Sequence, residues 1–368
     1  MTSQLTTPPA LLIKQHLTTA GQQLIEVTLN TPKSLNALNE DMIVGLLEHL
    51  PKWEADPQVM AIIMRGAGDR AFCAGGDIRQ LYAAMAAGQE AKGQQFFDAE
   101  YTLDLMLHEM HTPVLVWGNG YVMGGGMGLL QGASIRIGTP SSRLAMPEVS
   151  IGLFPDVAAS YFLRQLKDGL GLFLGLTGAM VNATDALDVG LLDVIVAEDD
   201  YARLLAQLQS LPLQQPSEQA QTIHQVVQHM TLVEGAPESD LADHRQALMQ
   251  ALGHENLVQV VEAISQLKGR SKWLDKAIGA MERGSPTSAH LCFRQFNSNV
   301  PSVKAALLQE YILGVNGTRK GEFQEGIRAL LIDKDQKPQW RYSSVEQVPE
   351  AWINSFYSHE NIINASFE

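Results

Sequence analysis

The sequence predicts an α/β protein, because strand-like and helix-like segments alternate over about residues 24–200. Short apolar runs typical of buried strands recur in this part, and each is followed by a turn and a helical pattern. After about residue 200 the strand signals stop, and mostly helical segments with Gly and Pro breaks continue to about residue 330. The alternation alone does not choose between a doubly wound dinucleotide fold and repeated strand–strand–helix units.

The first predicted elements are a strand, a helix and a second strand. Residues 24–29 alternate loosely between apolar and polar side chains, as in a half-buried strand. The stretch from about Asn39 to Ala55 has leucines on one face and an Asp-Pro pair after its end, which predicts a helix. Residues 59–66 form a short apolar strand, and Asp77 is predicted to begin the next helix.

The middle of the chain repeats this pattern. A helix is predicted for roughly 94–110, followed by a buried strand at 113–120. The glycine cluster 124–126 opens another helical stretch, and residues 134–139 and 143–148 are predicted to be strands.

Asp156 follows a proline, so it is expected to begin a helix over 155–166. Residues 182–196 are predicted to form a capped helix that leads into a strand. Residues 211–219 are a candidate linker. The charged stretch 331–340 is interrupted by proline, which favours a loop.

The composition of the chain argues against several classes of function. The net charge of −14 argues against binding nucleic acid, since an acidic chain repels phosphate backbones. Two cysteines allow neither a disulfide framework nor a zinc site of the CxxC type. No secretory signal and no apolar run of about 18 residues is apparent, so a soluble cytoplasmic protein without a membrane segment is expected.

Two glycine-rich turns, at 74–77 and 123–127, each lie between a predicted strand and a predicted helix. The first N–H groups of a helix have no internal partner, so two facing turns can offer two donors to one oxygen, as in an oxyanion hole. The alternative is tight packing of helix against sheet. A dinucleotide site is not favoured, because residues 118–123 place Met123 where the fingerprint requires its third glycine.

Three carboxylates are candidate site residues, and each has an ordinary alternative. Glu148 follows a proline at the end of an apolar strand and is either catalytic or a strand-end acid in a turn. Asp156 is either its partner in acid–base chemistry or only a helix cap. Glu100 shares a helix face with Phe96, Leu103 and Leu107, so it is either buried or at the edge of that face.

Other reactive side chains are interpreted as structural. His108 and His111 have a spacing that could serve a metal, but no partner cluster is apparent, so a solvated helix end is expected. Cys73 adjoins the first glycine turn, yet no histidine lies near it in sequence, which favours a buried core residue over a nucleophile. No metal site is predicted.

Three segments resemble the enoyl-CoA hydratase/isomerase (crotonase) superfamily, most closely its hydrolase branch. They are AFCAGGDI (71–78), VMGGGMGL (122–129) and AMPEVSIGLFPDVAASYFL (145–163). The glycine turns mark the superfamily only, whereas PEVSIGLFPD together with the tail EGIRALLIDKD points to the hydrolase branch. The resemblance implies a catalytic core of ββα units at 10–210 and a mostly helical region at 220–368 that packs on it.

The resemblance also implies a function and a set of site residues. The reaction would be hydrolysis of the thioester of 3-hydroxyisobutyryl-CoA, or of 3-hydroxypropionyl-CoA, during valine breakdown, with no cofactor beyond the CoA of the substrate. Backbone N–H groups of Gly76 and Gly125 would form the oxyanion hole. Glu148 would be the base or nucleophile, Asp156 would assist near the substrate hydroxyl, and Glu100 would contact substrate. Superfamily members often form trimers or hexamers, so a homo-oligomer is one expectation, and the extra C-terminal part preventing it is the alternative.

One departure from the superfamily pattern separates the competing activities. Hydratases carry a second catalytic glutamate shortly after the glycine triplet, and the matching position here is Gly128. Addition of water across a double bond requires two carboxylates that hold the water, so simple hydration is disfavoured. An isomerase on the same scaffold and a CoA-binding protein without turnover stay open as alternatives, although the second has no need of three acids.

Overall fold

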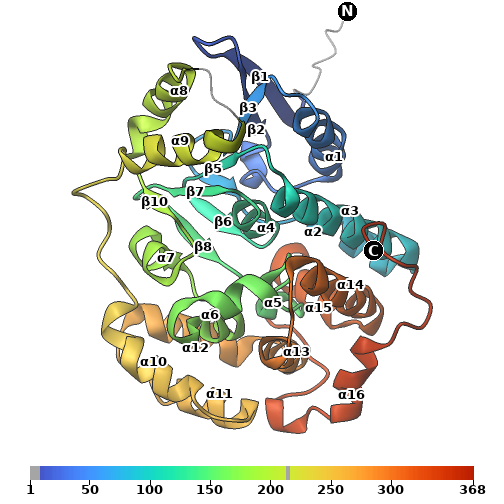
Figure 1. Ribbon diagram of the computed structural model, residues 1–368. Coiled ribbons are helices and arrows are strands. Elements are labelled where there is room, and N and C mark those ends of the chain that lie inside the picture. The colour runs from blue at the N-terminus through green and yellow to red at the C-terminus, as the bar shows by residue number, and fades with distance from the viewer. Residues whose placement is uncertain (1–8, 213–215) are drawn as a thin grey trace, which may run out of the picture.

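The computed structural model describes residues 9–212 and 216–368, and its strands form two sheets (Figure 1). The strands are β1 (Leu11–Leu17), β2 (Gln23–Leu29), β3 (Val59–Gly66), β4 (Ala71–Cys73), β5 (Val114–Gly118), β6 (Tyr121–Met123), β7 (Ile135–Gly138), β8 (Arg143–Ala145), β9 (Val181–Asn182) and β10 (Val194–Ile195). The six-stranded sheet has the order β1-β2-β3-β5-β7-β10, and the four-stranded sheet has the order β4-β6-β8-β9.

The helices that belong to the part of the chain with strands are α1 (Glu40–Glu54), α2 (Ile78–Ala86), α3 (Glu90–Glu109), α4 (Gly125–Gln131), α5 (Ala159–Phe162), α6 (Leu170–Thr177) and α7 (Ala183–Val189). After β10 follow α8 (Tyr201–Gln209), α9 (Pro216–Gln228), α10 (Arg245–Leu252), α11 (Leu257–Ser265), α12 (Lys272–Arg283), α13 (Pro286–Asn297), α14 (Val303–Lys320), α15 (Glu322–Ile327) and α16 (Glu350–Asn354).

A strand–strand–helix unit repeats, as in β3-β4-α2 and β5-β6-α4. The first strand of each unit joins the larger sheet and the second joins the smaller one. Pairing is parallel from β2 through β3, β5 and β7 to β10, and from β4 through β6 to β8. The structure therefore confirms the α/β fold class and selects the repeated ββα architecture over the doubly wound one.

Side-chain caps account for several predicted helix starts. The Asn39 side chain accepts a hydrogen bond from the N–H of Met42, and Asn182 caps α7 in the same way through Asp185. Asp77 caps α2 as predicted. These contacts are local in sequence, which is why composition and spacing were sufficient to place them.

Other expectations were wrong in position. The strand β1 was not anticipated, because it pairs only with β2 and most of its side chains are exposed. The strand expected at 143–148 ends at Ala145, and Glu148 begins a short 3₁₀ helix, Glu148–Ile151. Asp156 does not cap a helix, since α5 begins only at Ala159 and residues with positive φ intervene.

The helical C-terminal region packs closely on the core, and Figure 1 shows α10–α16, gold to red, at the end of the molecule away from α8 and α9. One cluster of buried hydrophobic residues runs from Ile25 to Ala365 and thus includes both parts. Helices α3 and α14 approach at glycines: a Cβ on Gly314 would lie 3.0 Å from the Phe97 ring. The division into a core at 10–210 and a helical region at 220–368 stays a prediction. Of the candidate linker 211–219, residues 213–215 lie outside the described residues, and the expectation is wrong from Pro216 on, where α9 begins.

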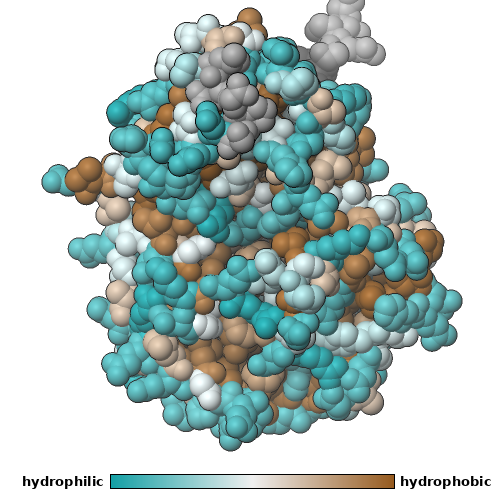
Figure 2. Space-filling model, in the orientation of Figure 1, coloured by the Kyte–Doolittle hydropathy of each residue, from teal (hydrophilic) through white to brown (hydrophobic). Residues whose placement is uncertain are grey.

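The surface shows the mixture of polar and apolar residues that is expected of a globular protein. On the face seen in Figure 2, hydrophilic residues predominate and hydrophobic residues are scattered between them. Among the described residues, no helix is both long enough and apolar enough to cross a membrane.

Candidate active site

The two glycine-rich turns face each other. Gly75 and Gly124 have φ values of +104° and +49°, which side chains rarely adopt, and a Cβ on Gly124 would lie 3.5 Å from the Cα of Gly75. A Cβ on Gly125 would lie 3.5 Å from the backbone nitrogen of Gly76. The strands β4 and β6 are parallel neighbours, so the turns that follow them meet at one edge of the smaller sheet.

Gly76 and Gly125 each present a backbone N–H group without a protein acceptor in the described part of the chain. Gly125 is the first residue of α4, where an N–H has no partner inside the helix. The predicted pair of donors is therefore brought together on adjacent turns. Such a pair can stabilise negative charge that develops on one oxygen.

Glu148 lies directly beside these turns. Its side chain is buried, with 5% exposure, and its Oε1 would lie 3.0 Å from a Cβ on Gly124. Its Oε2 is buried and has no hydrogen-bond partner among the described residues. Burial raises the pKa of Glu148 well above its usual value, and the negative charge of Asp156 raises it further.

Asp156 is also buried, and its carboxylate has a defined partner. The hydroxyl of Tyr101 on α3 donates a hydrogen bond of 2.7 Å to Oδ2 of Asp156. Burial raises the pKa of Asp156 to about 6, although this hydrogen bond acts in the opposite direction. The helix-cap alternative is excluded for its side chain, which points to α3 instead of a helix start.

Helix α3 supplies two further buried acids from one face. Glu100 is 4% exposed, so the buried alternative is the right one, and burial followed by the charge of Asp156 raises its pKa well above the usual value. Asp104 lies one turn later and is 1% exposed. Within residues 9–212 and 216–368, neither oxygen of Asp104 has a hydrogen-bond partner. Burial, then the charge of Glu100, raises the pKa of Asp104 well above the usual value.

Glu310 reaches the same cluster from α14 in the C-terminal region. Its oxygens accept hydrogen bonds from the N–H groups of Ala158 and Ser160 and from the Ser160 hydroxyl. Burial raises the pKa of Glu310 to about 7. The sequence predictions included none of three residues: Tyr101, Asp104 and Glu310. Only Asp104 carried a signal, because it shares the helix face of Glu100.

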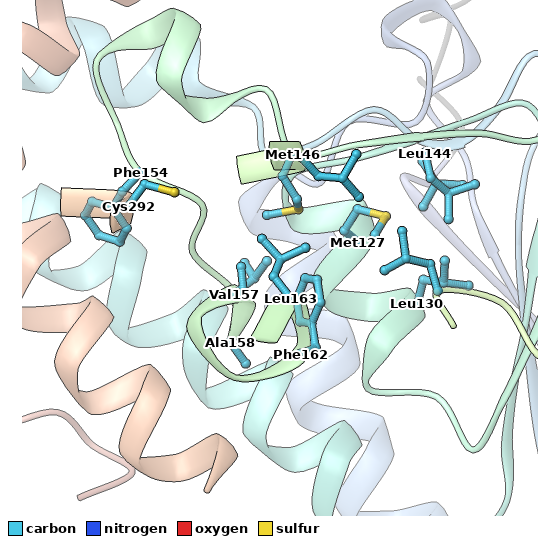
Figure 3. Packing of buried hydrophobic residues seen from close by; sticks show 14 of the residues in the cluster. Met127, Leu130, Leu144, Met146, Phe154, Val157, Ala158, Phe162, Leu163 and Cys292 are labelled. Atoms are coloured by element: carbon cyan, nitrogen blue, oxygen red, sulfur yellow. The ribbon is translucent and has the colours of Figure 1, made fainter. Parts of the chain in front are cut away.

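The segment 155–160, called here the Asp156 segment, is packed in apolar side chains. This packing explains the raised pKa values of the buried acids, since a low-dielectric surrounding disfavours the charged form of a carboxyl group. Figure 3 shows hydrophobic side chains lying around this segment: Met127, Leu130, Leu144, Met146, Phe154, Val157, Ala158, Phe162, Leu163 and Cys292.

Gly128 has no room for a side chain. A Cβ built on it would lie 2.6 Å from Oδ1 of Asp104 and 2.8 Å from Cβ of Val157. Contacts this short between heavy atoms are repulsive, since carbon atoms prefer about 3.5–4.0 Å. A glutamate at position 128 is therefore excluded, because the place of its side chain is taken by the Asp104 carboxyl group of α3 on one side and by Val157 on the other.

The remaining reactive residues are only partly as expected. Cys73 is fully buried, and burial raises the pKa of its thiol to about 12, which fits a core residue. The expected solvated end is wrong for His108, because its Nε2 is buried. Burial, then the charge of Arg136, lowers the pKa of His108 to about 4. His111 is exposed and lies beside Glu54. No group of three or more metal-ligating side chains is found in residues 9–212 and 216–368.

A cavity of about 340 Å³ lies next to the first glycine turn. Its lining includes Leu38, Asp77, Leu81, Lys92 and Phe96, from the segments around α1, α2 and α3. The Phe96 ring would contact a Cβ on Gly76 at 3.2 Å, so the cavity adjoins the facing donors. Its lining is partly apolar and carries a lysine.

Comparison with known proteins places this chain in a family. Residues 24–357 match the model of the enoyl-CoA hydratase/isomerase family. The chain is 35% identical to the mitochondrial 3-hydroxyisobutyryl-CoA hydrolase of Danio rerio over 333 residues, covering 90% of this chain and 86% of that one.

Two solved structures share its fold. An enoyl-CoA hydratase from Rhodobacter sphaeroides 2.4.1 is 30% identical with a TM-score of 0.81, over 95% of this chain and 97% of that one. A carnitinyl-CoA dehydratase from Mycobacterium thermoresistibile is 27% identical with a TM-score of 0.82, over 97% and 98% of the two chains. The chain belongs to the enoyl-CoA hydratase/isomerase family and has the crotonase fold.

Proposed function

We propose that this protein hydrolyses the thioester of 3-hydroxyisobutyryl-CoA to 3-hydroxyisobutyrate and CoA, a step in valine breakdown. The observation that carries the proposal is the packing at Gly128, which leaves no room for a glutamate at the position where a hydratase carries its second acid. The name of the Danio rerio relative supports the same reaction. Thioester hydrolysis needs only one base or nucleophile and an oxyanion hole, and both have candidates here.

In this proposal the N–H groups of Gly76 and Gly125 hold the thioester carbonyl oxygen. They polarise the carbonyl and stabilise the negative charge that develops as it is attacked. Removing one donor from such a hole typically raises the barrier by about 3–4 kcal/mol. Because both donors are backbone groups, their position is fixed by the glycine turns and not by a rotatable side chain.

Glu148 is the proposed base or nucleophile. Its unpartnered Oε2 is free to approach the carbonyl carbon or a water molecule. As a nucleophile it would form an anhydride while CoA leaves as the thiolate, and water would then hydrolyse the anhydride. As a base it would remove a proton from the attacking water. Its raised pKa makes the ionised form a stronger base than an exposed glutamate.

Asp156 and Glu100 are the proposed substrate contacts. Asp156 binds the 3-hydroxyl of the substrate or orients water, with its carboxylate held by Tyr101. Glu100 lies beside both glycine turns, because its Oε1 is close to the Cβ positions of Gly76 and Gly125. We propose the adjoining cavity as the path of the CoA chain, with Lys92 near its phosphates.

Hydration is the second candidate, because the Rhodobacter sphaeroides structure is named an enoyl-CoA hydratase and is 30% identical to this chain. The blocked position at Gly128 argues against it. Discrimination between 3-hydroxyisobutyryl-CoA and 3-hydroxypropionyl-CoA rests on one methyl group, worth about 1–3 kcal/mol in a fitted pocket. The expected cytoplasmic location remains a proposal, which cell fractionation would test.

The test of the proposed machinery is Glu148→Gln, assayed by CoA release with a thiol reagent. Glutamine keeps the size of the side chain but is neither a nucleophile nor a base. We expect turnover to be lost while the affinity for CoA is retained. Glu48→Gln is the control, because Glu48 lies on the surface of α1, where it pairs with Lys52. Wild-type turnover in Glu148→Gln would show that the assignment is wrong.

A further inference from the structure

The backbone that carries Asp156 adopts an unusual conformation. The two residues after it, Val157 and Ala158, have φ values of +52° and +69°. Positive φ is uncommon for residues other than glycine, and for a β-branched residue such as valine it is a genuine outlier. Strained conformations of this kind persist only where the surrounding structure holds them, and they cluster at functional sites.

Glu310 is the side chain that holds this segment. Its Oε2 accepts a hydrogen bond of 2.7 Å from the N–H of Ala158, and its Oε1 accepts bonds of 2.9 Å and 2.6 Å from the N–H and hydroxyl of Ser160. Glu310 is completely buried. Both oxygens are therefore engaged by the turn that follows Asp156, and Glu310 is turned toward that backbone.

The other side of Asp156 is held by a different element. Tyr101 on α3 donates to the Asp156 carboxylate itself, whereas Glu310 on α14 binds the backbone behind it. The two helices are fixed to each other, since Gly314 of α14 packs on the ring of Phe97 of α3. Asp156 thus lies between a core helix and a helix of the C-terminal region.

We propose that Glu310 is a positioning residue, which stabilises the Val157–Ala158 turn and thereby aims the Asp156 carboxylate at the substrate. This inference rests on the proposed function, because it gives Asp156 a part in the reaction. It also gives the C-terminal region a task in catalysis. Helix α14 supplies no group that touches substrate in this account, but the site is incomplete without it.

The test is Glu310→Gln, measured by CoA release from 3-hydroxyisobutyryl-CoA together with thermal unfolding. The amide oxygen can still accept from Ser160, but the amide N–H₂ group then faces the N–H of Ala158, so one bond is replaced by a clash of two donors. A displacement of about 1 Å at a reacting centre can cost about 100-fold in rate. We expect kcat to fall by about 10- to 100-fold with KM changed by less than about threefold.

Asp185→Asn is the matched control. Asp185 is also buried, and it accepts bonds from one serine hydroxyl, of Ser239, and from the N–H groups of Asp240 and Leu241. These bonds join α7 to residues 239–241, and none of them involves residues 155–160. We expect Asp185→Asn to lower the melting temperature as Glu310→Gln does, but to leave kcat of the folded enzyme unchanged.

A double-mutant cycle separates positioning from a general structural effect. If Glu310 acts through Asp156, then Glu310→Gln added to Asp156→Asn causes no further loss of kcat. Losses that multiply would overturn the proposal. If Glu310→Gln does not fold, Ser160→Ala replaces it in the same cycle, since it removes one of the three bonds and leaves both N–H donors in place.

The outcomes also distinguish this inference from the function on which it rests. Full turnover in Asp156→Asn would refute the role of Asp156 and with it the need to position it. A large loss in Asp156→Asn with wild-type kcat in Glu310→Gln and in Ser160→Ala would refute only the role of Glu310.

Discussion

Replacing Gly128 by alanine tests whether the missing second acid is imposed by packing. The added Cβ would lie 2.8 Å from the Cβ of Val157, about 1 Å inside the preferred separation of two carbon atoms, and 2.6 Å from Asp104 Oδ1. Neither neighbour can yield easily, because Val157 lies in the strained Asp156 segment and Asp104 is buried on α3. Overpacking of this kind costs about 1–3 kcal/mol, more than the roughly 1 kcal/mol that alanine gains over glycine in a helix.

We therefore expect Gly128→Ala to lower the free energy of unfolding and also to lower kcat, because Val157 is bonded directly to Asp156. Denaturant unfolding and CoA release measure the two effects. Gly253→Ala is the control at a helix end, where the added Cβ meets only ordinary contacts at 3.5 Å or more. A stable and fully active Gly128→Ala protein would refute the argument that no side chain fits there, and with it the main objection to a hydratase.

Three further predictions follow from the site. Tyr101→Phe removes a hydrogen bond that lowers the pKa of Asp156, so the acidic limb of the pH–kcat/KM profile should move to higher pH; an unshifted limb would contradict the contact. Burial raises the pKa of Asp156 from 3.8 to about 6, so the folded state binds the carboxyl proton more tightly than the unfolded state does. The stability that results, on the order of 3 kcal/mol, is fully present below the unfolded-state pKa and is lost as pH rises through about 6. Unfolding experiments should show a smaller loss of stability between pH 4 and pH 8 in Asp156→Asn than in wild type, and equal slopes would show that the carboxyl is not desolvated. Gly125→Ala places a methyl group against Glu100 Oε1 beside the Gly76 N–H, so kcat should fall about 100-fold or more, and retained turnover would exclude this pair of donors as the oxyanion hole.

Local signals in the sequence were sufficient for much of the fold. Asn39, Asp77 and Asn182 begin helices as predicted, because a cap depends on residues two or three positions away. The choice between ββα units and a doubly wound sheet was not available from such signals, since it depends on which strands pair across the chain. The paired sheets, in which β3 joins one and β4 the other, decided it.

The site was predictable only where a residue has a local signature. The turns at Gly76 and Gly125 were conspicuous by their glycines, and in the structure they face each other. Glu100 was conspicuous as an acid on an apolar helix face, and it is buried. Glu310 had no such signature, because its partner Ala158 lies 152 positions away in the sequence. The positive φ of Val157 was equally hidden, since nothing in a valine suggests it.

The most direct test of the central claim compares two substrates with the wild-type enzyme and Glu148→Gln. CoA release is followed with a thiol reagent, and hydration of crotonyl-CoA is followed by the loss of its enoyl absorbance. We expect fast thiol release from 3-hydroxyisobutyryl-CoA alone, and we expect Glu148→Gln to abolish it. Loss of the enoyl absorbance of crotonyl-CoA without thiol release from either substrate would contradict this expectation, because the protein would then be a hydratase despite Gly128.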